Sequence, residues 1–226
     1  MSSILSSRAG NLPEMSRPGL RERKKERTRR HIADTAARLF AERGYEQVAI
    51  SDVAREAEVA LQTVYNYFRT KEQLVTDQDG EIQDRLCELI RSRPPSSTPA
   101  TAIRDSVLES VDGIRNLPPQ IWRGEIGYLA AISPTVHRLV LELTDRQAAA
   151  LASAISDTAA IAPEIAKLQG IALAAVFQII ISEAGQRTLN GQSQAKIADE
   201  LHPIVGNILN ELDLWLNASE PANLAR

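Results

Sequence analysis

The sequence predicts an all-α protein with a small N-terminal three-helix domain and a larger C-terminal helical domain, about nine helices in total. Aromatic residues make up only 4% of the chain, whereas Ala, Leu, Ile, Glu and Arg recur throughout, a balance that favours helix over sheet. Proline and glycine divide the chain into segments of helical length. With 226 residues, 43% of them hydrophobic, the chain can bury a sizeable core.

Charge is distributed unevenly along the chain. Residues 1–75 carry 14 Lys and Arg against 10 Asp and Glu, whereas residues 76–226 carry 12 against 19. Such asymmetry is expected when only one part of a chain approaches a polyanion. The N-terminal part is therefore the better candidate for contact with nucleic acid, and the acidic remainder should face a different partner.

Cysteine usage and hydropathy indicate a cytoplasmic protein. Cys87 is the only cysteine, which excludes an intrachain disulfide, a thiolate metal cluster and a CxxC redox pair. The first 19 residues lack the apolar core of a signal peptide. The strongest apolar run, residues 171–181, is interrupted by Gln178 and is too short to cross a bilayer, so we expect no membrane partner.

The N-terminal part should begin with a flexible arm, because residues 1–20 mix Ser, Gly, Pro and Arg without periodicity. Eight positive side chains then fall within residues 17–30. Apolar residues recur at helical spacing from Ile32 until Gly44, which can cap a helix end, so we expect a helix over residues 22–43.

Two short helices should follow, over residues 51–57 and 61–67, joined by a tight turn. Lys71 is expected to open a longer helix that runs to Arg91, because the prolines that follow in residues 93–99 end it. We place a domain boundary inside this fourth helix, near residue 75.

The predicted organisation is therefore an arm (residues 1–20), a small helical domain (residues 21–75) and a larger helical domain (residues 76–226). Pro203 lies inside the last predicted helix and should kink it or restart it. The helices expected in the larger domain after residue 91 cover residues 99–115, 119–131, 134–160, 163–190 and 193–217.

The most informative stretch is residues 50–74. Its apolar residues can converge on one small core beneath the first helix, while amide, hydroxyl and phenol groups remain on or near the other face. Such groups suit base edges and phosphates in a DNA major groove. The apolar set is Val53, Ala54, Val59, Val64 and Phe68; the polar set is Gln62, Thr63, Tyr65, Asn66 and Tyr67.

This stretch resembles the DNA-binding signature of the tetracycline-repressor (TetR) family, in which Ile-x-Asp-Ile-Ala leads through Ala-Gly-Val-Ser to Thr-x-Tyr-x-His/Tyr-Phe-x-x-Lys-Glu-x-Leu. With Gly44 and Tyr45 included, the resemblance covers roughly residues 25–75. It implies a helix-turn-helix transcriptional regulator that binds a roughly palindromic DNA operator as a homodimer.

The chain departs from the family signature at three positions. Glu58 stands where the family has Gly in the turn, and a non-glycine residue in a left-handed conformation would cost about 1–2 kcal/mol. Ala60 replaces the Ser or Thr cap of the recognition helix, at a cost of about 0.5–2 kcal/mol. Ala49 also replaces a Thr, although Ser51 could cap that helix instead.

The resemblance and the helix geometry together assign roles within the DNA-binding domain. Gln62 is our first choice for recognition of a base edge, with Asn66 one turn further along the same face. The N-terminus of a helix favours an anion, so side chains at the start of the first helix should meet phosphate. The expected phosphate contacts are Thr28, Arg29, Arg30, Thr63, Tyr65, Tyr67 and Lys71.

The larger domain is expected to bind a small, mostly apolar effector that releases a repressor from its operator, with the fourth helix as the lever. Aromatic and polar residues that lie among small ones could leave a cavity, although ordinary core packing would explain each of them. A helical DNA-binding scaffold without an effector is a further alternative, and it would lack a cavity. The tentative pocket residues are Trp122, Glu125, Tyr128, His137 and Phe177.

The last two helices are predicted to form the dimer interface. Their apolar stripes are wider than a monomer needs to cover, and two such helices from each subunit would close a four-helix bundle. The stripes are Leu168, Ile171, Ala172, Ala175 and Ile179 on one helix, and Ile197, Leu201, Ile204, Ile208 and Leu212 on the other.

No catalytic or metal-binding motif is evident, so an enzyme is the less favoured class and we expect no metal or cofactor. The three histidines, His31, His137 and His202, are far apart, and the sequence has no HExxH motif, GxSxG motif or phosphate-binding glycine loop. Asp199 and His202 form a single i, i+3 pair, which is more typical of a surface contact than of a metal site.

Overall fold

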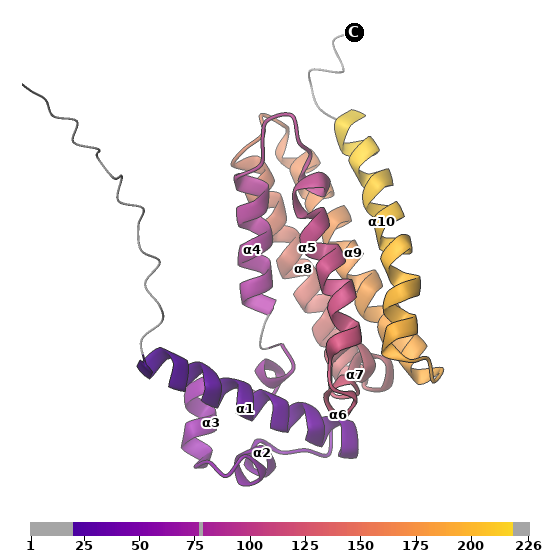
Figure 1. The fold of residues 1–226 in the computed structure, drawn as a ribbon. Coiled ribbons are helices and arrows are strands. Elements are labelled where there is room, and N and C mark those ends of the chain that lie inside the picture. Colours follow the sequence, from indigo (N-terminus) through magenta and orange to yellow (C-terminus); the bar gives the residue numbers. More distant parts are fainter. Residues whose placement is uncertain (1–19, 77–78, 219–226) are drawn as a thin grey trace, which may run out of the picture.

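The computed structural model describes residues 20–76 and 79–218, all of whose regular elements are helical, as predicted (Figure 1). The predicted arm, residues 1–20, lies outside the described residues except for Leu20, which begins α1. Three of the predicted segments, residues 71–91, 99–115 and 119–131, are each divided into two shorter elements in the structure.

The N-terminal helices agree closely with prediction: α1 is Leu20–Arg43, α2 is Ile50–Glu56 and α3 is Leu61–Tyr67. Gly44 ends α1 with a φ of 81°, a conformation that glycine adopts without steric cost. The N-terminal cap of α2 is Ala49, whose amide donates to the Asp52 carboxylate at 3.0 Å. Ser51 lies inside the helix, so the alternative that it caps α2 is wrong.

The predicted continuous helix over residues 71–91 is divided in two. A short 3-10 helix, η1 (Glu72–Leu74), is followed by α4 (Asp79–Arg91). Leu74 is buried in the same core as α1–α3, and Val75 packs against that core. The chain is therefore held on the N-terminal domain through Val75, and Lys71 does not stand at the start of a long helix.

The C-terminal part is a helical bundle in which α9 lies between α7, α8 and α10. Threonine and serine cap two helices at positions that precede proline: Thr98 caps α5 and Ser133 caps α8. The elements are α5 (Pro99–Gly113), η2 (Ile114–Asn116), α6 (Pro119–Trp122), α7 (Ile126–Ile132), α8 (Pro134–Ser156), α9 (Pro163–Leu189) and α10 (Gln194–Ala218).

Two of these elements differ from prediction. The expected helix over residues 119–131 is interrupted between α6 and α7, where Gly124 touches the backbone of α1; a Cβ atom there would lie 1.8 Å from the Ala37 carbonyl oxygen. The last helix, in contrast, does not restart at Pro203, because α10 continues through that exposed residue.

Glycines allow the bundle helices to approach closely. A Cβ atom on Gly185 of α9 would lie 2.1 Å from the Gly127 carbonyl oxygen of α7. A Cβ atom on Gly170 of α9 would lie 2.4 Å from the Ala148 carbonyl oxygen of α8. Both distances are far below any van der Waals contact, so backbone packs directly on backbone at these two crossings.

The two parts of the molecule share a core. Leu129 of α7 and Val136 of α8 are completely buried in the hydrophobic cluster of the N-terminal helices. Ser133, between them, donates a hydrogen bond from Oγ to the Glu46 carboxylate, and this bond lowers the pKa of Glu46 below its usual range. α4, which we expect to be the lever between domains, packs on α8 and α5.

By length and composition alone, α9 could also cross a membrane, since its most apolar window has a mean hydropathy of 1.8. In the structure it is a central helix of the bundle, and it buries Gln169 and Thr188. Thr188 receives a hydrogen bond from Trp122. Only 33% of the apolar window is buried, so the core of the bundle explains part of the composition of α9 and leaves an exposed apolar face.

Candidate nucleic-acid interface

The predicted recognition helix, α3, is anchored on one side and exposed on the other. Val64 is completely buried and Phe68, which follows the helix, is 1% exposed. Gln62 and Asn66 are exposed on the opposite side, and the Gln62 Nε2 donates to the Asn66 Oδ1 at 3.2 Å. The structure thus brings together the two residues expected to recognise bases, one helical turn apart.

The turn that precedes α3 has the conformation that the sequence comparison with the TetR signature predicts. Glu58 has a φ of 53°, in the left-handed region that favours glycine. Backbone hydrogen bonds hold the turn, including Val59 N to Ala54 O at 3.0 Å. Ala60 caps α3 without any side-chain hydrogen bond. The angle of α3 therefore depends on its packing rather than on its cap.

The three residues predicted to meet phosphate at the start of the DNA-binding domain lie along α1. Thr28 donates its hydroxyl to the Lys24 carbonyl at 3.0 Å, and Arg30 pairs with Glu26 at 3.6 Å while staying largely exposed. The Arg29 guanidinium lies 5.6 Å from the centre of the Phe68 ring, which ties this part of α1 to the end of α3.

The remaining predicted phosphate contacts differ in exposure. Tyr65 is 41% exposed, on the same side of α3 as Gln62. Thr63 and Tyr67 are half-buried, and Tyr67 packs against the N-terminal core. A half-buried tyrosine can offer its hydroxyl to a phosphate while its ring serves the core.

Lys71 has a structural role that the sequence did not suggest. Its ammonium group donates to the Tyr45 carbonyl and lies 4.1 Å from the centre of the Tyr45 ring. Burial lowers the pKa of Lys71 below its usual value, against the opposing effect of Glu46 and Glu72. The expectation that Lys71 stands at the N-terminus of the next long helix is wrong, because that helix is broken between η1 and α4. The role of Lys71 as a phosphate contact stays a prediction.

The five tentative pocket residues do not surround one cavity. Trp122 is buried and donates its indole N–H to Thr188 at 3.0 Å, and Phe177 packs against the C-terminal core. Tyr128 packs instead against the N-terminal core, and His137 is exposed on α8. Glu125 stands at the N-terminal cap of α7. These residues occupy different layers of the molecule.

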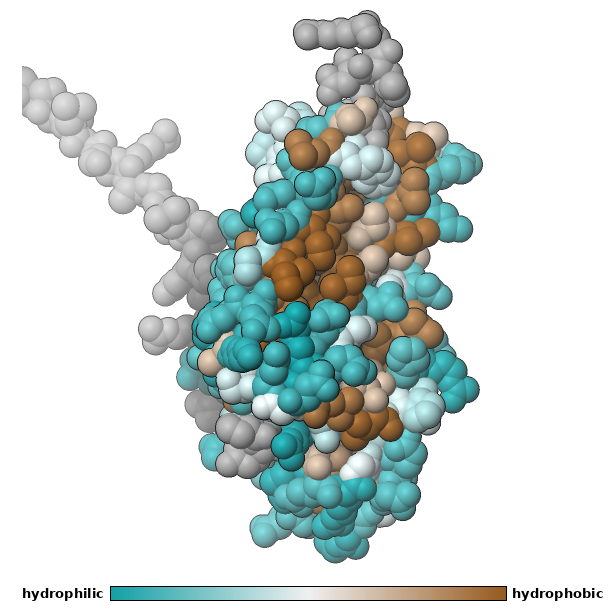
Figure 2. All heavy atoms as spheres, turned by 90° about the vertical axis from the view of Figure 1, so that its right-hand side faces the viewer, coloured by the Kyte–Doolittle hydropathy of each residue, from teal (hydrophilic) through white to brown (hydrophobic). Residues whose placement is uncertain are grey.

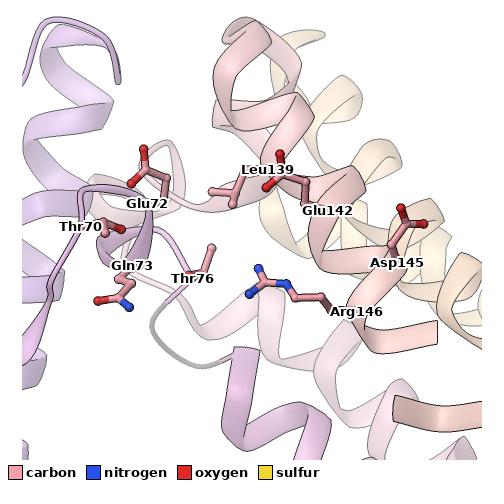
Figure 3. A pocket seen from close by; sticks show the side chains of 8 residues that line it. All are labelled: Thr70, Glu72, Gln73, Thr76, Leu139, Glu142, Asp145 and Arg146. Atoms are coloured by element: carbon pink, nitrogen blue, oxygen red, sulfur yellow. The ribbon is translucent and has the colours of Figure 1, made fainter. Parts of the chain in front are cut away.

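A hollow of about 580 Å³ lies elsewhere, at the junction of the two parts (Figure 3). One wall comes from the segment around η1 and the other from α8, so sequence reasoning could not bring its residues together. Seven of its eight lining residues have polar side chains, among them three carboxylates and one guanidinium. The lining residues are Thr70, Glu72, Gln73, Thr76, Leu139, Glu142, Asp145 and Arg146.

The predicted dimer residues divide into an exposed and a buried group. Leu168, Ile171 and Ile179 of α9 are 49%, 48% and 37% exposed, and Ile204 of α10 is 40% exposed. Figure 2 shows apolar side chains gathered on this face of the molecule. The half-buried members of the predicted set are Ala172, Ala175, Ile208 and Leu212.

Ile197 and Leu201 must be removed from the predicted interface. Both are completely buried in the core of the C-terminal part, so they have no surface to offer to a second subunit. The apolar stripe on α10 is wide because one side of the stripe packs in the core of the same subunit. Only the other side remains for contact with a partner.

The Asp199 and His202 pair is not joined in the structure. Asp199 accepts from Arg115 at 2.8 Å, whereas His202 lies 3.1 Å from the Asp112 carboxylate. Among residues 20–76 and 79–218, His, Cys, Asp and Glu side chains form no group of three that could hold a metal ion.

Comparison with known proteins agrees with this arrangement. Residues 32–77 match the family described as "Bacterial regulatory proteins, tetR family". The HTH-type transcriptional regulator TcmR of Streptomyces glaucescens is 32% identical over 107 residues, which are 42% of this chain and 47% of TcmR. The chain thus matches about half the length of that relative.

Two solved structures are also similar. NalD, the secondary repressor of the MexAB-OprM multidrug efflux pump in Pseudomonas aeruginosa, is 17% identical with a TM-score of 0.49, over 81% of this chain and 95% of NalD. The TetR family repressor AlkX from Dietzia sp. strain DQ12-45-1b is 20% identical with a TM-score of 0.42, over 81% of this chain and 95% of AlkX.

Both TM-scores lie below 0.5, so the assignment depends on the N-terminal sequence match and on the helix-turn-helix that it covers. The matched family and TcmR are both described as regulatory proteins rather than as enzymes. Residues 32–77, which contain α2, α3 and part of α1, are thus similar to the N-terminal part of TetR-family regulatory proteins.

Proposed function

We propose that the protein is a homodimeric, sequence-specific repressor that leaves its operator DNA when a small molecule binds to its C-terminal domain. The observation that carries this proposal is the division of α3 into an anchored side, through Val64, and an exposed polar side, through Gln62 and Asn66. A rigidly held helix with amides on its outer side suits recognition in a DNA major groove.

The chemistry of the outer side supports base recognition. A glutamine or asparagine amide can donate and accept at the same time, as the edge of adenine requires. The Gln62–Asn66 hydrogen bond holds both amides on one face before DNA is bound. Gln62, in the first turn of α3, is the residue that we expect to discriminate most between bases.

The exposed apolar residues of α9 support a dimer. Leu168 and Ile171 are half-exposed on successive turns, an arrangement that a second copy could cover by two-fold symmetry. A symmetric dimer presents two recognition helices, so it would bind a roughly palindromic operator. We expect this DNA binding to take place in the cytoplasm, where the DNA is accessible.

The shared core supports coupling between the two parts. Because Leu129 and Val136 are buried in the N-terminal core, a shift of α7 or of the start of α8 must be followed by the DNA-binding helices. The hydrogen bond from Ser133 to Glu46 reinforces the same junction. An effector that favours one arrangement of α6–α8 would then change operator affinity by linkage.

We keep two candidates for the effector class. A mostly apolar compound is the candidate that the sequence suggests, and it would have to open the packed core that contains Trp122 and Phe177. The hollow at the domain junction favours a polar, cationic compound instead, because Glu72, Glu142 and Asp145 outnumber Arg146 in its lining. Thermal-shift screening with matched apolar and cationic compounds would separate the candidates.

The function is tested by selection of bound sequences from a random DNA pool, followed by affinity measurements at several salt concentrations. Gln62→Ala should weaken binding by about 1–3 kcal/mol on the preferred operator and much less on scrambled DNA. Lys71→Ala should weaken both equally. Gln83→Ala, on α4, is the matched control and should bind as the wild type does.

Two outcomes would contradict the proposal. If no sequence were enriched from the random pool, the protein would not be a sequence-specific regulator. If Gln62→Ala lowered affinity for operator and scrambled DNA by the same factor, α3 would not be placed against base edges as we propose.

A further inference from the structure

The first helix begins well before the domain core that it serves. Ile32 is the first fully buried residue of α1, and the helix already begins at Leu20. Each of residues 21–27 is exposed. At a rise of 1.5 Å per residue, residues 21–27 extend about 10 Å beyond the part of α1 that contacts the rest of the domain.

This helical extension concentrates positive charge. Residues 21–30 carry seven Lys and Arg against Glu22 and Glu26, although the whole chain has a formal net charge of −3. A helix that is polar all round gains no stability from burial, so its composition is not explained by packing. The excess positive charge is greater than an exposed α-helix requires to stay in solution, and it indicates a polyanionic partner.

The positive residues occupy distinguishable faces of the helix. At 100° per residue, Arg21 and Lys25 lie on the stripe that continues into Ile32, and this stripe packs towards α2 and α3. Arg23 and Arg27 lie on the opposite side of the helix. The chain therefore contains two basic pairs of equal charge and equal spacing that face in different directions.

The inner end of the extension meets the end of the recognition helix. The Arg29 guanidinium lies over the ring of Phe68, which directly follows α3, and the His31 Nε2 lies 3.2 Å from the Ala57 carbonyl oxygen in the turn before α3. In Figure 1 the indigo end of α1 continues past α3. The Arg21–Lys25 stripe thus lies beyond α3, on the side of α1 that α3 occupies.

We propose that Arg21 and Lys25 contact phosphates of the duplex outside the half-site in which α3 lies. The inference rests on the proposed function, since it takes α3 as the element in the major groove. Duplex DNA continues past the half-site, and lysine and arginine neutralise its phosphates without regard to base sequence. Each subunit would lengthen the footprint at its own end of the operator.

The test compares two double variants on two lengths of DNA. Arg21→Ala/Lys25→Ala and its matched control Arg23→Ala/Arg27→Ala remove the same charge from opposite faces. Each is titrated with salt on the selected operator, either trimmed at the half-sites or carrying ten extra base pairs at each end. Circular dichroism of both variants checks that α1 remains helical.

We expect Arg21→Ala/Lys25→Ala to bind the long duplex about tenfold more weakly than the wild type does. The slope of log affinity against log salt should fall by about 0.9 per lost contact, or about 1.8 per subunit. On the trimmed duplex the variant should equal the wild type. Arg23→Ala/Arg27→Ala should equal the wild type on both.

Three outcomes would overturn the proposal. Equal losses of DNA affinity in both double variants would indicate a general effect of net charge, and equal losses on both duplexes would place the contacts inside the half-site. No loss of affinity in Arg21→Ala/Lys25→Ala would exclude the contacts. Failure of the proposed function would be separate, because the wild type would then bind operator and scrambled DNA equally. The comparison of long and short duplexes could still be made on such DNA.

Discussion

The two parts of the molecule expose surfaces of opposite character. In the N-terminal part, the core is closed within the chain, and the exposed side of α3 presents Gln62 and Asn66. In the C-terminal part, α9 leaves Leu168 and Ile171 half-exposed although the core behind them is complete. A polar surface next to the basic start of α1 suits a polyanion, whereas an apolar surface suits a second protein surface. The exposed side of each part, rather than its core, indicates its partner.

The two parts also differ in what holds their helices in place. The N-terminal part contains unfavourable local structure, Glu58 in a left-handed conformation and Ala60 as an ineffective cap, and depends on side-chain packing to offset it. The C-terminal part depends on close backbone contacts through Gly127, Gly170 and Gly185. We therefore expect that substitutions can readily stabilise the N-terminal part and readily destabilise the C-terminal part.

The largest effect should come from charges placed on the exposed face of α9. Leu168→Glu/Ile171→Glu should weaken self-association at least 100-fold, about 2.7 kcal/mol, because carboxylates would be buried in an apolar interface. Sedimentation velocity over a range of micromolar concentrations measures this. Leu141→Glu, on the exposed side of α8, is the control and should leave association unchanged. If the wild-type protein were monomeric throughout this range, the exposed apolar face of α9 would not bind a second copy of the chain.

A smaller effect is expected where backbones touch. Gly185→Ala should lower the free energy of unfolding by about 2 kcal/mol, because its Cβ atom would overlap the Gly127 carbonyl oxygen and force α7 and α9 apart. Gly113→Ala, with no atom within 4 Å of the new Cβ, should be neutral or slightly stabilising. Urea unfolding at one fixed protein concentration gives both values. Equal stability of the two variants would show that the α7–α9 contact is not tightly packed.

The smallest effect should be a gain in the N-terminal part. Glu58→Gly should raise the free energy of unfolding by about 1 kcal/mol, because it removes the Cβ that makes a φ of 53° unfavourable. Glu58→Ala keeps that Cβ and should give no comparable gain, so it separates backbone strain from loss of the carboxylate. Thermal unfolding of the two variants is sufficient, and a similar gain from both would point to charge instead.

The sequence alone determined the all-α class, the bounds of α3, the left-handed turn at Glu58 and the polar outer side that carries Gln62 and Asn66. These features are local: helical periodicity, turn chemistry and a motif act over a few neighbouring residues, so they can be recognised without knowledge of the fold.

Only the tertiary structure decided which neighbour covers each apolar or charged side chain. It placed Ile197 and Leu201 inside the subunit, turned Lys71 towards Tyr45 and drew Leu129 into the N-terminal core. Periodicity shows that a helix has an apolar face but not whether that face meets its own chain or a partner. That distinction depends on contacts between residues far apart in sequence, where packing and burial are decided.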